Sequence, residues 1–416
     1  MRTARIRPDL LGPECPEGLE IVQITTGELP STHIYMEAQI FTPDSKRFLL
    51  HESATPHGSD PKDPNHRYLL CDLEQGCKLS PVTQETGATA PSVSPDGMHV
   101  YYFVDETRLD GGKLTLKRMN LDGSAREVLY VLQGTVPGTP FFPSQIYPLS
   151  TIRSDGKSLA LSCFLADMGS GRRTWGLMVF DLENPSVTLI LEGPSWCNVH
   201  PQYSRSIHPG SQRDILVQEN HGNTHTPEGE IIDLTGGNGA DVHVIRDDGS
   251  SFRNMPWGRD GNEFCQGHQC WRGGTAWAIT STDTRHPDEQ QLIESVCVPH
   301  TGHDGARSPG AIRNNLSREF PSPSFSHFAT DASGSWFVTD TFACDNGGRV
   351  FVARMGNAGT DPLSSWTCIA YPRCSWRKDA HIHPFLSPDG KTAFFNSDES
   401  GVLQAYMVRG LESLGI

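Results

Sequence analysis

The chain has 416 residues, with 34 Lys or Arg against 49 Asp or Glu, so its formal net charge is −15. This balance argues against a nucleic-acid binder, which needs a basic face, but it allows a small anionic ligand in a locally basic pocket. No apolar run is long enough to span a membrane, and the basic N-terminus lacks the apolar core of a signal peptide. We therefore expect a cytoplasmic protein without nucleic-acid or membrane partners.

A short turn motif recurs along the whole chain. It is clearest as Ser-Pro-Asp-Gly at 94–97 and 387–390, and five weaker copies bring the number to seven. The copies are 52, 59, 54, 64, 60 and 56 residues apart, measured between Ser45, Gly97, Gly156, Gly210, Gly274, Gly334 and Gly390. A period of about fifty residues is typical of the blades of a β-propeller.

Each turn is followed by a short apolar strand rich in β-branched or aromatic residues, as at 100–103, 159–161, 214–217 and 393–395. The 30 prolines and 41 glycines fit a fold dense in turns, and no long amphipathic helix is evident. The sequence therefore predicts an all-β protein. We expect a seven-bladed β-propeller of four-stranded antiparallel blades that forms a single domain over 1–416.

The two ends of the chain supply the parts of one blade. The C-terminal unit offers three strands, at 383–386, 392–396 and 404–408, whereas a four-stranded blade needs one more. The segment 19–25 reads as a strand that precedes the first repeat. We expect it to become the outer strand of the last blade, which would close the propeller and cover an exposed edge.

Histidines recur at one position of the repeat, just upstream of the last four turns: His200, His268, His327, and the pair His381 and His383. In a propeller the first strand of each blade lines the central channel, so these side chains are expected to converge. Two histidines at alternate positions of a strand point to the same side and can hold one metal ion. A third imidazole from the adjacent blade, with open positions left, describes a catalytic metal site. The plainer alternative is a set of hydrogen-bonded structural histidines.

Several other polar residues are candidates for substrate binding. Arg205, Arg272 and Lys378 lie close in sequence to the histidine positions, and guanidinium groups bind carboxylates through paired hydrogen bonds. His200 and His221 are further candidates, although His221 lies in a polar stretch where a solvated loop residue is equally expected. Together these residues favour a small acidic substrate.

The histidine segments carry a resemblance to a known family. Gly-His-Gln-Cys-Trp at 267–271, Phe-Ser-His-Phe at 325–328, Ser-Trp at 375–376 and His-Ile-His-Pro at 381–384 resemble segments of oligogalacturonate lyases. The Asn-Ser-Asp at 396–398 is similar to the close of that family's last blade. The family consists of seven-bladed, cytoplasmic polysaccharide lyases, and the resemblance covers most of the chain.

The resemblance implies a metal, usually manganese, held by His327, His381 and His383, with His268 as the catalytic base. The family's fourth ligand, a glutamine, falls on Lys378, so a water, Asp379 or Gln266 could take that place, and Lys378 could instead bind the substrate carboxylate. The implied activity is β-elimination on short uronic-acid oligosaccharides.

Two alternatives remain open from the sequence. One is a non-catalytic propeller of the Tol type that serves as a binding scaffold. The other keeps the metal but acts on a different uronic-acid glycoside, as a lyase or as a hydrolase.

Overall fold

The computed structural model describes most of the chain: residues 4–55, 60, 62–83, 85–108, 111–220, 224–226, 231–233, 239–257, 263–283, 290–296, 312–318, 320, 325–341, 347–377 and 380–415. Within these ranges the regular structure consists of β-strands and two short 3₁₀ helices, Pro8–Leu10 and Leu411–Leu414, with no α-helix. The expected all-β class is confirmed. No helix in the described part of the chain has the length and apolar character needed to cross a membrane.

Five of the sheets in the described residues have four antiparallel strands each. The first two comprise β7–β10 (Ala88–Val93, His99–Arg108, Gly111–Asn120, Glu127–Gln133) and β11–β14 (Phe142–Ile152, Ser158–Ala166, Arg173–Asp181, Ser186–Gly193). The third comprises β15 (Gln202–Tyr203), β16 (Asp214–Asn220), β19 (Ala240–Arg246) and β20 (Arg253–Asn254). The last two comprise β21–β24 (Phe264–Trp271, Trp277–Asp283, Gln291–Val296, Arg313–Asn315) and β25–β28 (Phe328–Thr330, Trp336–Asp340, Val350–Arg354, Ser364–Ala370). A two-stranded ribbon, β17 (Thr224–His225) and β18 (Ile231–Asp233), falls between β16 and β19.

A nine-stranded sheet joins the two ends of the chain. One run contains β3–β6 (Ser31–His33, Arg47–Glu52, Arg67–Asp72, Lys78–Thr83). The other contains β29–β31 (Phe385–Leu386, Ala393–Ser397, Gln404–Arg409), followed by β2 (Glu20–Gln23) and β1 (Arg5–Ile6). A single parallel pairing, Ser31 with Gln404, connects the runs. The N-terminal strand β2 lies antiparallel to β31, from Glu20 opposite Arg409 to Gln23 opposite Tyr406.

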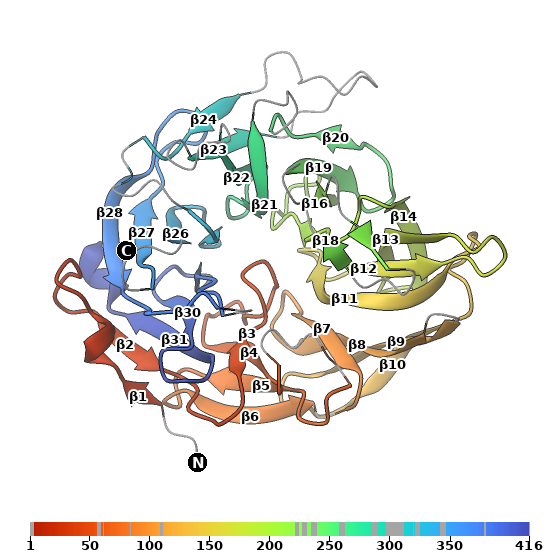
Figure 1. The fold of residues 1–416 in the computed structure, drawn as a ribbon, viewed down its shortest axis with the longest axis horizontal. Coiled ribbons are helices and arrows are strands. Elements are labelled where there is room, and N and C mark those ends of the chain that lie inside the picture. Colours follow the sequence, from red (N-terminus) through yellow and green to blue (C-terminus); the bar gives the residue numbers. More distant parts are fainter. Residues whose placement is uncertain are drawn as a thin grey trace.

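The sheets are arranged in a circle around a common centre, like the blades of a propeller (Figure 1). The first strand of a sheet lies nearer the centre than its last strand, as β21 and β24 show (Figure 1). Residues at the start of a sheet, far apart in sequence, therefore approach one another in the middle.

The hydrophobic core lies between neighbouring sheets. Phe103 of β8 and Phe180 of β13 belong to adjacent sheets, and their ring centroids are 5.0 Å apart. A sheet covered on both faces needs apolar residues at successive positions rather than alternate ones. Strand β12 shows this, because all nine of its residues are buried. Burial on both faces holds the sheets rigidly and fixes the positions of their inner ends.

The repeated turn has a physical reason. In the turn at 94–97, the Asp96 carboxylate accepts a hydrogen bond from the backbone N–H of Met98, and Ser94 Oγ accepts one from that of His99, both at 2.9 Å. Gly97 has φ +71°, a left-handed backbone that glycine adopts without strain. The turn at 387–390 repeats these bonds. The motif therefore marks the hairpin between the first two strands of a sheet.

The pairing of β2 with β31 leads to a stability prediction. Ile21 on β2 is fully buried, whereas Ile6 on β1 is 65% exposed. Replacing Ile21 by Ala should lower the free energy of unfolding by about 2–5 kcal/mol, because it leaves a cavity in the core. The matched change Ile6→Ala should stay within about 0.5 kcal/mol of the wild type. Urea unfolding of both variants checks this, and equal effects would contradict the packing of β2.

Candidate metal centre

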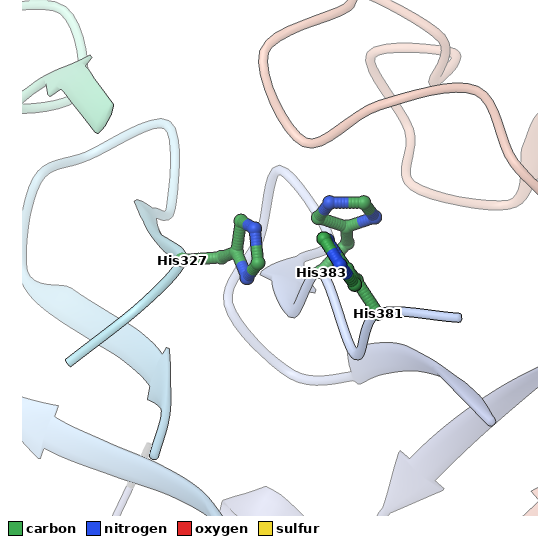
Figure 2. A group of neighbouring side chains, drawn as sticks. All are labelled: His327, His381 and His383. Atoms are coloured by element: carbon green, nitrogen blue, oxygen red, sulfur yellow. The ribbon is translucent and has the colours of Figure 1, made fainter. Parts of the chain in front are cut away.

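Three imidazoles gather near the centre of the circle of sheets. His327 lies just before β25, and His381 and His383 lie before β29. One nitrogen of each residue lies within 4.8 Å of those of the others (Figure 2). The closest pair of imidazole centroids, His327 and His383, is 4.2 Å apart, and the indole of Trp376 stacks beside His327 at 6.2 Å. Three convergent nitrogens match the ligand set of a divalent transition metal.

The backbone of this site differs from the strand predicted for 383–386. Residues 381–384 lie outside regular structure, and β29 begins only at Phe385. His383 has φ +44°, in the left-handed region that side chains with a Cβ rarely adopt. The two imidazoles therefore converge through this backbone twist and not through strand alternation.

The same left-handed twist recurs at the inner ends of other sheets. His200 has φ +47°, Ala90 has φ +49°, and Gly267, directly before His268, has φ +86°. The register of the strand pairing shifts around Ala90 of β7 and around Gly267 of β21, because each of these strands has extra residues there. Such shifts are β-bulges. Such bulges turn side chains out of the sheet. Backbone strain of this kind is often concentrated at functional sites.

A buried carboxylate orients His327. Asp340, at the end of β26, lies with Oδ2 2.9 Å from Nδ1 of His327, and its Oδ1 accepts the backbone N–H of His327 at 2.7 Å. Burial raises the pKa of Asp340 to about 7, against the effect of that backbone hydrogen bond. A histidine that uses Nδ1 in this way keeps Nε2 for a metal ion. The sequence analysis missed Asp340, since nothing in the local sequence marks it as a partner.

His268 lies beside the three histidines, with its imidazole centroid 4.5 Å from that of His327. Its Nδ1 is buried and has no hydrogen-bond partner among the described residues. Burial lowers the pKa of His268 well below its usual value, and His327 lowers it further. His268 is therefore neutral at pH 7 and has the protonation state of a general base.

The carboxyl group of Glu37 and the phenol of Tyr35 extend the site toward His200. Glu37 Oε2 lies 3.0 Å from His200 Nδ1, and Glu37 is only 4% exposed. The centroid of the Tyr35 ring lies 5.1 Å from His200 and 5.0 Å from His383, so Tyr35 connects this pair to the three histidines. Burial raises the pKa of Glu37, and His200 opposes this. Glu37 follows no recognisable motif, so the sequence did not indicate it.

The predicted substrate-binding residues differ in where the structure places them. Arg205 is half-buried. Burial lowers the pKa of its guanidinium, and the negative charge of Glu37 is among the effects that raise it, so the charges of Arg205 and Glu37 interact. Arg272 is not brought to the histidines. Its guanidinium donates to Glu294, at 2.5 Å, and to two backbone carbonyls, which assigns it to packing between neighbouring sheets. His221 and Lys378 lie outside the described residues.

No protein-family model matches this chain, and no curated protein matches it by sequence. Solved structures do match. An oligogalacturonate lyase in complex with manganese has a TM-score of 0.68 at 18% identity, covering 100% of both chains. An oligogalacturonate lyase from Vibrio parahaemolyticus has a TM-score of 0.68 at 16% identity, covering 98% of this chain and 97% of the other. The resemblance seen in the sequence is confirmed, and at this identity it shows a shared fold.

The contact between Asp340 and His327 leads to a prediction for metal affinity. Asp340→Asn should weaken binding of a divalent ion by about 10–100-fold, because the imidazole loses the carboxylate that orients it. Titration with Mn²⁺ in a calorimeter measures the change, with the exposed Asp122→Asn as control. Unchanged affinity in Asp340→Asn would contradict the orienting role of Asp340.

The lowered pKa of His268 leads to a prediction for stability. Below about pH 6.5 the unfolded chain protonates this histidine, whereas the folded protein does not. The free energy of unfolding of the metal-free wild type should therefore fall relative to that of His268→Gln as the pH drops below about 6.5. Urea unfolding of both proteins, repeated at intervals of about half a pH unit between pH 8 and pH 5, measures the difference. A difference that stays constant would contradict a neutral His268 in the folded protein.

Proposed function

We propose that this protein is a metal-dependent lyase that cleaves short uronic-acid oligosaccharides, of the oligogalacturonate type, by β-elimination. The observation that carries the proposal is a neutral, half-buried His268 beside the convergent His327, His381 and His383. The fold shared with oligogalacturonate lyases, one of them in complex with manganese, supports it. The product would be an unsaturated uronate.

The three convergent histidines have the donor set for a divalent ion, and we propose manganese. All three offer imidazole nitrogens as ligands, and Asp340 holds His327 in the orientation for binding. When bound, the ion would supply a Lewis acid that withdraws charge from the substrate carboxylate.

His268 is assigned the proton transfer. Its neutral imidazole takes the proton from C5, the carbon that bears the carboxylate. The electron pair left at C5 forms the double bond to C4, while the bond from C4 to the glycosidic oxygen breaks and that oxygen takes up a proton from solvent water. Arg205 and His200 are proposed to bind the acidic sugar, and His221 and Lys378 remain predicted substrate contacts. Preorganised cations near the developing negative charge lower the barrier without reorganisation.

We also propose that the chain forms one seven-bladed domain over 1–416. In this arrangement the five four-stranded sheets are joined by two further blades, β3–β6 and β29–β31 with β2. Strand β2 would then be the fourth strand of the last blade, with the two-residue β1 beyond it. The antiparallel pairing of β2 with β31 supports this closure.

The proposal predicts separable effects of two histidine variants. His268→Ala should lower turnover of oligogalacturonate by about 10²–10⁴-fold and keep the metal, because it removes only the base. His381→Ala should lose the activity together with the metal of the three-histidine centre. Ultraviolet absorbance of the conjugated alkene measures elimination, and elemental analysis measures the metal. The exposed His208→Ala serves as the control.

Each alternative function has its own outcome in these assays. Cleavage without a conjugated alkene would mean hydrolysis. Binding without cleavage, in a protein that takes up no metal, would mean a scaffold. Full activity in His268→Ala would remove His268 from the mechanism.

A further inference from the structure

A second group of metal-type ligands lies in the sheet that contains β16 and β19. Glu219 of β16 and Asp241 of β19 are direct partners in the antiparallel ladder, so their side chains share one face. His243 lies two residues further along β19 and points to the same face. One ligand atom of each residue lies within 4.8 Å of those of the others. When two ligand atoms each lie about 2.1 Å from one ion, they are ~3–4 Å from each other, which is comparable to the separations in this group.

The two carboxylates stand directly opposite each other on neighbouring strands. Like charges directly opposite in an antiparallel pair are destabilising. Both residues are only half-buried, so the repulsion is partly screened by solvent. A cation held between them would replace this repulsion by two attractive contacts.

The orientation of His243 points to the same conclusion. His243 is 2% exposed, and its Nδ1 lies 2.8 Å from Oδ1 of Asn254, its partner on β20. A carbonyl oxygen only accepts hydrogen bonds, so Nδ1 carries the proton. In a neutral imidazole the lone pair is then on Nε2, which faces Oε2 of Glu219 at 3.1 Å. Metal-binding histidines commonly donate their other N–H to an oxygen in this way.

The surroundings hold the group in place. The rings of Trp196 and Phe252 pack against His243, with centroids at 5.4 and 4.7 Å. Ser195 Oγ donates to Oε1 of Glu219 at 2.6 Å. Ser195 begins the segment 195–200, which ends at His200. The group therefore connects to the backbone that presents His200 to the central site.

We propose that Glu219, Asp241 and His243 bind one divalent metal ion, at a site separate from the three-histidine centre. One imidazole with two carboxylates suits ions of the manganese and zinc type, whereas calcium prefers oxygen ligands alone. The ion fixes Glu219, and through Ser195 it fixes the segment that leads to His200. This proposal does not depend on the lyase activity.

The experiment counts bound metal. Each protein is treated with a chelator, dialysed against Mn²⁺ and analysed for its manganese content. The wild type should bind two equivalents, His243→Ala one, His381→Ala one, and the double variant none. The exposed His208→Ala is the control and should keep two. Manganese binding by His243→Ala equal to that of the wild type would overturn the second site, as would its complete loss in His381→Ala.

A milder variant separates metal binding from folding. Asp241→Asn keeps the size of the side chain and removes one of the two opposed charges. In the His381→Ala background, Mn²⁺ should raise the melting temperature, and Asp241→Asn should abolish this rise while raising the melting temperature of the metal-free protein. An ion pair between Glu219 and His243 alone would give no rise with Mn²⁺ in either protein, and that result would overturn the proposal.

The two proposals fail independently. If the three-histidine centre did not bind metal, the wild type would hold one equivalent and His243→Ala none, which supports the second site. If only the second site were absent, the wild type would hold one equivalent and His381→Ala none.

Discussion

The protonation state of closely packed imidazoles is the constraint on which the central site depends. The imidazoles of four histidines contact one another here: His268, His327, His381 and His383. His327 and His383 are buried, and His268 and His381 are half-buried. Positive charges on adjacent imidazoles would repel one another, and burial penalises each charge further. The pKa of His268 is lowered for both reasons. Neutral imidazoles expose lone pairs, and such lone pairs can bind a metal ion or accept a proton.

The fold can hold the imidazoles this close together because the packing of the sheets fixes the backbone independently of the site. The sheets pack face to face, and strands such as β12 are buried along their entire length. The inner ends can then hold strained conformations, as at His200 and His383, which a less rigid scaffold would relax. Asp340 adds a further constraint, because its two oxygens hold both the backbone and the imidazole of His327.

The sequence predicted features that repeat or that carry a distinctive residue type. The recurring turn revealed the hairpins, and the histidine register located the residues that the structure brings together. It also placed a strand near 19–25, which is found as β2, Glu20–Gln23. Periodicity and residue type are local properties, so a single sequence displays them directly.

Features that depend on contacts between distant segments were missed. Glu37 and His200 are 163 residues apart in the chain and meet only in the folded protein. Arg272 has the charge expected of a substrate contact, yet its geometry commits it to Glu294. The left-handed backbone at His383 was equally hidden, because a histidine between two apolar residues also fits a regular strand.

The most direct test of the central site is a crystal structure with Mn²⁺, with anomalous scattering recorded at the manganese edge. The account predicts a peak about 2.0–2.2 Å from one nitrogen each of His327, His381 and His383, with His268 close by but not coordinated. A peak coordinated by His268 would contradict its role as the base. The absence of a peak among the three histidines at saturating Mn²⁺ would contradict the metal centre itself.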